Sequence, residues 1–371
     1  MGLYIGLMSG TSMDAVDAAL VDIEADTCRL IAQHNQPIPP PLGQRLQRLI
    51  QSETFEVREL GSLDVEIGRL FAAAANRLLQ QTHIDKGGIE AIGSHGQTVF
   101  HAPDSEPPFT LQIGDPNTIA QLTGITTVAD LRRRDMVVGG QGAPLATAFH
   151  NHHFRSPDHD RVILNIGGIA NITVLPAEPQ APVLGLDTGP GNCLMDDWIR
   201  QQRGEPYDSD GHWGAGGRVD EALLSRLLAD PYFARAAPKS TGREYFHLSW
   251  LARHQADEAS PQDVQATLAA LTIESISRAI ERFAPDTQEV FVCGGGAYNA
   301  LLLQGLKGRL AQMRVDTSAA LGVPPEWVEA AAFAWLAQQT LARRPGNLIE
   351  VTGAAEPVIL GGIYPGSSFR P

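Results

Sequence analysis

Apolar residues recur along the chain with two periods, and the order in which these periods appear repeats. Residues 3–9 and 18–23 are mostly apolar runs that predict strands, and the polar turn "SGTSMDAVD" separates them. An extended run, "LIAQHNQPIP", follows. Helices are then predicted over residues 43–51 and 57–81, the second with leucines and isoleucines on one face. Short strands at "IEAIGS", "FTLQIGD" and "ITTVAD", with a helix around residues 117–122, complete an α/β pattern.

The second half of the chain restarts the same order. Two strands around a Gly turn are predicted in "RVILNIGGIANITVLP", a third strand in "PVLGLDTGPGN" and a helix in "NCLMDDWIRQQRG". A long helix follows, with Ser260 as N-cap, Pro261 at its first position and Asp263 as capping-box partner. The strand "EVFVC" and a helix in "PPEWVEAAAFAWLAQQTLARR" end the pattern. The chain therefore holds two copies of a strand–strand–strand–helix–strand–helix order, although the two halves share few identical residues.

This repeated order predicts two α/β domains, each a mixed β-sheet with flanking helices. The length of 371 residues agrees, because a single core rarely extends that far. We predict that residues 1–132 together with 346–371 form domain I, which carries the first Gly turn. Residues 133–345 form domain II, which carries Asp187 and a triple-Gly turn. Ligands of such folds bind beyond the strand ends.

Composition and charge narrow the class of protein. Hydrophobic residues make up 43% of the chain and charged residues 19%, which is typical of a globular protein. The formal charge of −14 argues against binding to nucleic acid or to an anionic membrane surface. The three cysteines show no metal-type spacing, and no apolar run approaches the ~20 residues needed to cross a bilayer. We therefore expect a cytoplasmic protein.

The first Gly-rich turn, "GLMSGTSMD", suits a phosphate group. Glycine and small hydroxyl residues leave backbone N–H groups pointing into open space, where an anion can bind. The lysine of a P-loop is missing from this turn. An ordinary hairpin turn explains a lone Gly–Ser turn equally well.

Three further turns carry candidate chemistry. In "GLDTGPGN", an apolar strand places Asp187 at its end, where a carboxylate can accept a proton or orient a magnesium-bound phosphate. The alternative is that Asp187 only stabilises its own turn. In "VCGGGAYN", three glycines allow a purine or ribose to approach the backbone, whereas helix–strand packing explains only one of them. With the paired glycines of "NIGGIANIT", these turns favour a nucleotide held between two domains.

Eight motifs, taken in order along the chain, resemble those of the bacterial anhydro-N-acetylmuramic acid kinases. They are "GLMSGTSMD", "IGSHGQT", "DLRRRD", "GGQGAPL", "LNIGGIANIT", "DTGPGNCLMD", "PKSTGRE" and "VCGGGAYN". The resemblance covers nearly the whole chain. It implies two actin-like (RNase H-like) domains around a central nucleotide cleft, with ATP and Mg²⁺ as cofactors. It also implies that 1,6-anhydro-N-acetylmuramic acid is hydrolysed at its anhydro bridge and phosphorylated on O6. The products would be N-acetylmuramic acid 6-phosphate and ADP, formed during murein recycling.

The resemblance also assigns residues. Asp187 is implied as the general base that activates water, with Glu329 as the second catalytic residue. Glu329 lies in the first turn of the last predicted helix, where stabilisation of the helix dipole is a sufficient structural reason for it. Thr98 and Arg134 match positions near the sugar. The residues expected to bind the nucleotide are Gly10, Thr11, Ser12, Met13, Asp14, Ala15, Val16 and Asp17 in the first loop, and Gly167, Gly294 and Gly295 in the later turns.

One residue departs from the family pattern, and the metal ligands cannot be predicted. Ala15 stands where the family loop commonly has glycine, so a positive φ at that position would be strained. Two other functions stay open: an actin-like kinase of another hexose or amino sugar, and a nucleotide-dependent sensor or chaperone ATPase without sugar chemistry. The expected partners are a small sugar and ATP. A homodimer is compatible with the resemblance.

Overall fold

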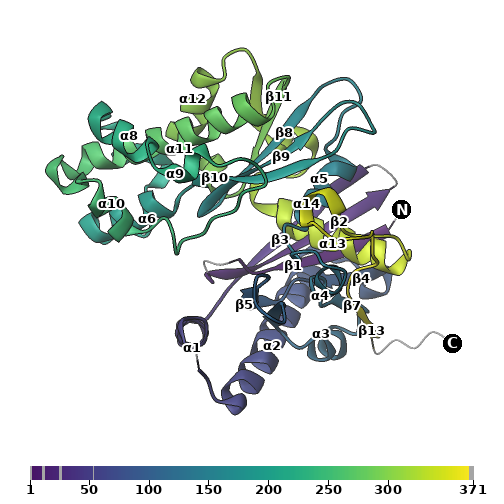
Figure 1. The fold of residues 1–371 in the computed structure, drawn as a ribbon. Helices are drawn as coiled ribbons and strands as arrows, with labels where there is room; N and C mark the ends of the chain where they lie inside the picture. Colours follow the sequence, from purple (N-terminus) through teal and green to yellow (C-terminus); the bar gives the residue numbers. More distant parts are fainter. Residues whose placement is uncertain (1, 11–12, 25–26, 53, 367–371) are drawn as a thin grey trace. The chain divides into compact units, whose positions relative to one another are not determined.

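The computed structural model describes residues 2–10, 13–24, 27–52 and 54–366 (Figure 1). The chain forms two compact units. The first consists of Met1–His153 together with Trp327–Pro371, and the second of Phe154–Glu326. Each unit has its own β-sheet and its own hydrophobic core.

The first unit is built on a six-stranded mixed sheet in the order β13-β7-β4-β1-β2-β3. Its strands are β1 (Gly2–Met8), β2 (Ala15–Glu24), β3 (Thr27–Pro37), β4 (Ile89–Ser94), β7 (Thr127–Ala129) and β13 (Gly362–Tyr364). The neighbours β1–β2 and β2–β3 are antiparallel, whereas β1–β4 and β4–β7 are parallel. A separate antiparallel pair consists of β5 (Gln97–Ala102) and β6 (Phe109–Ile113).

Helices cover both faces of this sheet. They are α1 (Pro40–Gln51), α2 (Val57–Thr82), α3 (Pro116–Thr123), α4 (Arg133–Val137), α5 (Ala146–His153), α13 (Val328–Leu341) and α14 (Ile349–Thr352). Ile5 and Leu7 of β1 share a core with Phe71 of α2. Gly6 faces the other way, since a Cβ on it would overlap the carbonyl oxygen of Ala330 in α13.

The second unit repeats the sheet. Its order is β10-β9-β8-β11-β12, with strands β8 (Arg161–Ile166), β9 (Ile169–Leu175), β10 (Leu184–Pro190), β11 (Glu289–Cys293) and β12 (Arg314–Thr317). The pairs β8–β9 and β9–β10 are antiparallel, and β8–β11 and β11–β12 are parallel. Its helices are α6 (Cys193–Arg203), α7 (His212–Ala215), α8 (Glu221–Leu228), α9 (Pro231–Ala234), α10 (Leu248–Arg253), α11 (Pro261–Phe283) and α12 (Ala300–Arg309). Short 3₁₀ helices span Lys86–Gly88, Ser209–Gly211, Ala256–Glu258, Gly295–Tyr298, Ser318–Leu321 and Pro325–Trp327.

The two sheets confirm the predicted fold class. In each, three consecutive antiparallel strands are followed by two strands parallel to the first, which is the repeated order expected from the sequence. The start of α11 is confirmed as well, because the Ser260 hydroxyl accepts the backbone N–H of Asp263 at 3.2 Å. The Asp263 carboxylate accepts the N–H of Arg218 at 2.7 Å.

Several features were not apparent in the sequence. The bounds of the compact units lie at 153/154 and 326/327, whereas the predicted domain bounds lie at 132/133 and 345/346, because α5 and α13 pack with the first unit. The predicted division stays a prediction about functional domains.

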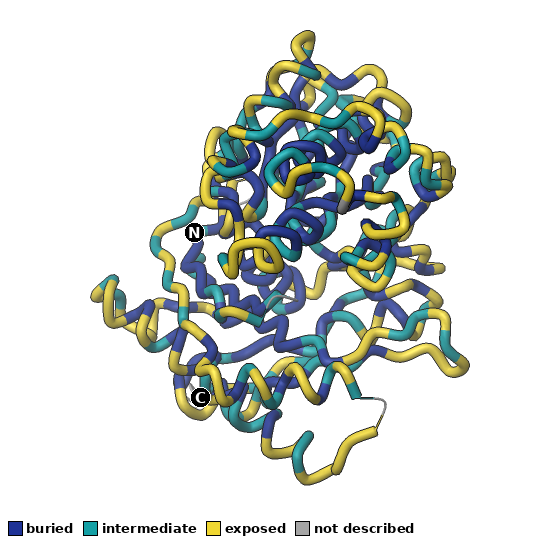
Figure 2. The backbone as a smooth tube through the Cα atoms, turned by 90° about the vertical axis from the view of Figure 1, so that its left-hand side faces the viewer, coloured by how far each residue is buried: buried dark blue, intermediate teal, exposed yellow. Residues whose placement is uncertain are grey.

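Strands β5, β12 and β13 were missed, since three to six residues of mixed polarity carry little periodicity. Exposed and buried residues alternate along many helices, as Figure 2 shows.

No helix among the described residues is both long and apolar enough to cross a membrane.

Candidate active site

The first Gly turn links β1 to β2 and is anchored by side chains. The Ser9 hydroxyl donates to Oε1 of Gln97 at 2.7 Å, and Nε2 of Gln97 lies 3.5 Å from the carbonyl oxygen of Gly10. Thr11 and Ser12 lie outside the described residues. Met13 has a φ of 55°, in the left-handed region. The turn is thus held from β5 by a buried glutamine.

The end of the turn corrects one expectation. Ala15 opens β2 and pairs with Pro37, so the positive φ falls on Met13 instead and Ala15 carries no such strain. Asp14 is exposed, whereas Val16 is fully buried in the core and has no accessible surface. Asp17 accepts a hydrogen bond from Nδ2 of Asn35 at 2.7 Å.

A group of charges surrounds Glu329 at the start of α13. The pKa of its carboxyl is raised, chiefly because packed protein atoms reduce its hydration; the charge of Asp17 adds to the effect and that of Arg132 opposes it. The residue keeps exposed surface. Within the first unit, the fold thus places Glu329 within electrostatic range of Asp17, another predicted site residue, and of Arg132.

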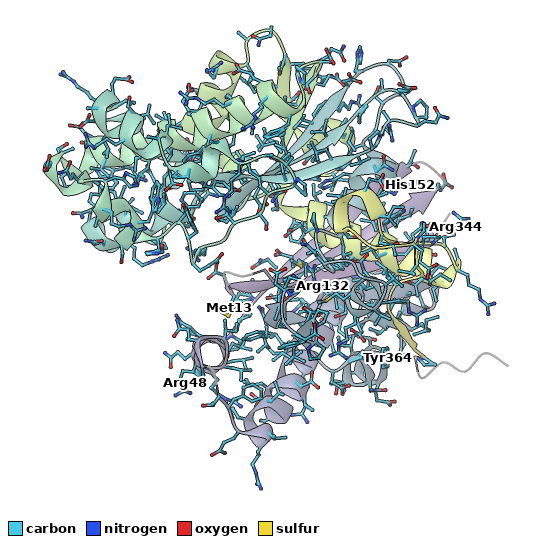
Figure 3. All side chains as sticks on the ribbon, in the orientation of Figure 1. Met13, Arg48, Arg132, His152, Arg344 and Tyr364 are labelled. Atoms are coloured by element: carbon cyan, nitrogen blue, oxygen red, sulfur yellow. The ribbon has the colours of Figure 1, made fainter. Side chains whose placement is uncertain are left out.

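Three hydrogen bonds fix the guanidinium of Arg132, a side chain labelled in Figure 3. Its Nη1 donates to the carbonyl oxygen of Gly142 at 2.8 Å, and its Nε and Nη2 donate to Nε2 of His95 at 3.1 and 2.8 Å. His95 must therefore be neutral, with its proton on Nδ1. This agrees with its pKa, which burial and the Arg132 charge hold well below the ordinary value. Burial lowers the pKa of Arg132 to about 10, although Glu329 and Asp135 oppose the shift.

The two predicted sugar contacts occupy different settings. Thr98 is partly buried in β5, and its hydroxyl accepts Nε2 of Gln112 at 3.2 Å. Arg134 is exposed on α4, two residues beyond the anchored Arg132. Their contact with a sugar stays a prediction.

Asp187 is the fourth of the seven residues of β10, so the strand continues to Pro190, past the end predicted from the sequence. The pairing with β9 changes register between Asp187 and Gly189. Its Oδ2 accepts the backbone N–H of Thr241 at 3.0 Å, and its own N–H donates to the carbonyl oxygen of Lys239 at 3.0 Å. The Tyr232 hydroxyl donates to the Asp187 carbonyl oxygen at 2.7 Å. Both the backbone and the carboxylate of Asp187 are thereby fixed.

The pKa of Asp187 is raised to about 6, mainly by burial. The N–H of Thr241 and the charge of Lys239 lower it, and Glu244 raises it. A carboxyl with this pKa is ionised at neutral pH and still basic enough to take a proton from water in a transition state. This is the protonation behaviour of a general base.

The other Gly turns of the second unit lie near the start of α6. The carbonyl oxygen of Gly167 accepts the N–H of Asn192 at 2.8 Å. Gly294 has a φ of 79°, and a Cβ there would overlap Oδ1 of Asn165. No described atom lies within 4 Å of the Cβ position of Gly295, so this backbone borders open space.

That open space is a cavity of roughly 590 Å³ contained in the second unit. The exposed rings of Tyr207 and Tyr298 belong to its lining. Its other lining residues are Asn192, Met195, Asp196, Asp208, Ser209, Asp210, Gly295 and Asn299. Among the described residues, three or more metal-binding side chains nowhere gather into a metal site.

Sequence reasoning missed Arg132 in the first unit, and Lys239 and Thr241 beside Asp187 in the second unit. Each belongs to a motif that the sequence singles out, "DLRRRD" or "PKSTGRE". Nothing in those letters distinguishes Arg132 from Arg134, because only the fold turns one toward His95 and leaves the other exposed.

The sequence matches the family described as anhydro-N-acetylmuramic acid kinase over residues 2–366. A relative from Coxiella burnetii with that name is 51% identical over 99% of this chain and 98% of its own length. Another from Shewanella loihica is 52% identical over 98% of this chain and 99% of its own length.

Two solved structures that match share much less sequence with this chain. A ROK family glucokinase from Streptomyces griseus, in complex with glucose and AMPPNP, has 14% identity and a TM-score of 0.42, covering 91% of this chain and 100% of its own. The activator of the 2-hydroxyisocaproyl-CoA dehydratase from Clostridium difficile has 12% identity and a TM-score of 0.45, covering 90% of this chain and 92% of its own.

The identity to curated relatives extends over nearly the full length of both partners, so the predicted family and enzyme class are confirmed: the chain belongs to the anhydro-N-acetylmuramic acid kinase family.

Proposed function

We propose that this kinase uses ATP to convert 1,6-anhydro-N-acetylmuramic acid into N-acetylmuramic acid 6-phosphate, with ADP as the second product. The observation that carries the proposal is Asp187, a carboxylate within β10 that is held by the Thr241 N–H and has a pKa of about 6. A kinase that only phosphorylates a free hydroxyl needs no added water, whereas opening an anhydro bridge does.

The reaction follows from this base. Asp187 takes a proton from water as the water oxygen bonds to C1 of the sugar, and the bond between C1 and O6 breaks. O6 is released as a developing alkoxide, bonds to the γ-phosphorus of ATP, and ADP leaves. Glu329 is proposed as the second catalytic residue, with Thr98 and Arg134 as sugar contacts.

The nucleotide is proposed to contact two sets of residues. The loop of residues 10–17 would bind phosphate oxygens through its backbone N–H groups. The 590 Å³ cavity beside Gly295 is of a size that suits a nucleoside, and the rings of Tyr207 and Tyr298 offer surfaces for a base to stack on. Gly167 and Gly294 complete the proposed nucleotide contacts.

Magnesium, when bound, would neutralise phosphate charge. It commonly uses one or two protein carboxylates, with phosphate oxygens and water as its remaining ligands. The lack of a larger ligand cluster among the described residues is therefore compatible with it. Asp17, at the end of the first loop, is a carboxylate that could serve in this way.

We also propose the cellular compartment in which the enzyme acts. Cys28 and Cys193 are buried free thiols, which supports a reducing compartment such as the cytoplasm. The homodimer stays a prediction.

Isotopic labelling tests the reaction directly. The protein is incubated with ATP and the anhydro sugar in ¹⁸O-water, and the product is examined by mass spectrometry and NMR. We expect one ¹⁸O at C1 and phosphate on O6. A product without label at C1 would instead indicate phosphorylation of a free hydroxyl. N-acetylmuramic acid, offered in parallel, should stimulate little ATP consumption.

Asp187→Asn tests the base. The amide keeps the size of the side chain and an oxygen for the Thr241 N–H but cannot take a proton, so kcat should fall about 10²–10⁴-fold. Asp286→Asn, an exposed site in the same unit, is the matched control and should keep normal turnover. Wild-type activity in folded Asp187→Asn would contradict the assignment.

A further inference from the structure

Lys239 is unusual among the lysines of this chain. The sequence contains three, Lys86, Lys239 and Lys307. The first and last are exposed, whereas Lys239 retains 9% of its accessible surface. An ammonium group is strongly hydrated, and removing it from water is costly unless other groups compensate.

The compensation that Lys239 receives is modest. Its Nζ lies 4.4 Å from the centroid of the Tyr232 ring and donates to the Tyr232 carbonyl oxygen across 3.4 Å. A cation over an aromatic ring and one long hydrogen bond replace little of a full hydration shell. The anion whose charge favours protonated Lys239 is Asp187.

Lys239 and Asp187 are also joined through the backbone. The Asp187 N–H donates to the Lys239 carbonyl oxygen at 3.0 Å, and two residues later the Thr241 N–H donates to Oδ2 of Asp187 at 3.0 Å. Tyr232, which holds the ammonium, donates its hydroxyl to the Asp187 carbonyl oxygen at 2.7 Å. The segment that carries the buried charge is thus the one that orients the carboxylate.

We propose that Lys239 is a positioning residue, whose buried ammonium keeps the Asp187 carboxylate ionised at neutral pH while residues 239–241 fix its orientation. The inference rests on the proposed role of Asp187 as general base. Its physical core is that a positive charge in a poorly hydrated place lowers the proton affinity of a nearby carboxylate.

The other charges near Asp187 define what Lys239 must counteract. Burial and Glu244 both favour the protonated carboxyl, whereas the Thr241 N–H and Lys239 favour the ionised one. Tyr232 stays neutral, because burial and the charge of Asp187 raise its pKa. Loss of the ammonium would leave the Thr241 N–H to oppose burial.

The charges near Lys239 limit the pH range of the effect. Burial, Arg282 of α11 and Arg235 lower its pKa to about 8, and Asp187 opposes them. Lys239 is therefore mostly protonated at neutral pH. Asp187 is ionised above about pH 6, so both groups are charged between roughly pH 6 and 8.

The test compares Lys239→Met, Lys239→Arg and the exposed control Lys307→Gln with the wild type. The pH dependence of kcat/KM and the ¹³C-carboxyl NMR titration of Asp187 are measured on each. We expect Lys239→Met to move both midpoints upward by about one pH unit and to lower kcat/KM about fivefold at pH 6. The Arg variant and the control should keep the wild-type midpoints, since both retain the buried charge. Unchanged midpoints in folded Lys239→Met would overturn the proposal.

A reciprocal measurement does not depend on that variant folding. With three lysines, ¹³Cε-labelled protein gives few lysine signals to assign. Asp187→Asn removes the anion, so the midpoint of Lys239 should fall, whereas those of Lys86 and Lys307 should stay. A Lys239 midpoint that does not move would also overturn the coupling. Activity in Asp187→Asn would refute the base and not the coupling, so the two failures are distinguishable.

Discussion

At the level of single residues, the raised pKa of Asp187, which suits its proposed role as a base, opposes stability. Its pKa rises from 3.8 to about 6 in the folded protein. Between these values the folded state binds more protons than the unfolded state, so the free energy of unfolding decreases as the pH rises through this window. Above about pH 6 the full penalty of holding a buried carboxylate is present.

Asp187→Asn should therefore stabilise the protein at neutral pH while it removes activity. Asn carries no charge to bury, and we expect the free energy of unfolding at pH 7 to rise by about 1 kcal/mol, allowing for the partial exposure of the side chain. Urea denaturation at pH 7 and pH 4 measures this. The gain should shrink toward pH 4; an equal gain at both pH values would mean that the carboxyl does not titrate in this window.

At the level of elements, the position of Glu329 depends on how closely α13 approaches the first sheet. A Cβ on Gly6 of β1 would overlap the carbonyl oxygen of Ala330, and one on Gly93 of β4 would overlap that of Phe333. Glycine is required at these two strand positions because helix backbone occupies the space of a side chain. The same contact holds the first turn of α13, and hence Glu329, in place.

Gly6→Ala should thus cost stability and activity together. Overpacking against backbone costs about 1–3 kcal/mol, and displacement of α13 should also lower kcat/KM. Gly61→Ala is the control: Gly61 is exposed in α2 with no described atom within 4 Å of its Cβ position, so alanine should stabilise by about 0.5–1 kcal/mol. Chemical denaturation followed by circular dichroism compares them. Equal stability of the two variants would show that α13 can move away freely.

At the level of the whole molecule, the first unit is assembled from both ends of the chain. The fully buried Asp135 joins them: it accepts the N–H of Gly142 at 2.7 Å, Nδ2 of Asn347 at 2.8 Å and the hydroxyl of Thr352 at 2.8 Å. Gly142 in turn accepts Nη1 of Arg132. One carboxylate thus links the returning C-terminal segment to the charged group near Glu329.

Asp135→Asn should weaken the attachment of the C-terminal segment to the rest of the first unit. Three donors converge on two carboxylate oxygens, and an amide offers one oxygen and a donor in their place, leaving at least one buried donor without an acceptor. We expect a loss of about 1–3 kcal/mol in the free energy of unfolding. Asp286→Asn, on the surface, should change it by less than ~0.5 kcal/mol. A neutral outcome at Asp135 would indicate that the C-terminal segment is held by other contacts.

The order of strands and helices, the cap of α11 and the Gly-rich turns could be predicted from the sequence. These features depend on periodicity and turn chemistry within a few residues, and the family motifs preserve the same local information. The short strands and the bounds of the units could not, because edge strands and packed helix ends depend on neighbours far along the chain.

The chemical character of the charged side chains was decided by the tertiary structure. Arg132 and Arg134 are equivalent in the sequence, yet one donates to a buried histidine and the other is exposed. In the sequence, Lys239 is a lysine in a polar segment. In the fold, the Tyr232 ring of α9 lies beside its ammonium group, and Asp187 of β10 donates to its carbonyl oxygen. Burial and the distance between charges set these properties, and both arise only when distant segments of the chain pack together.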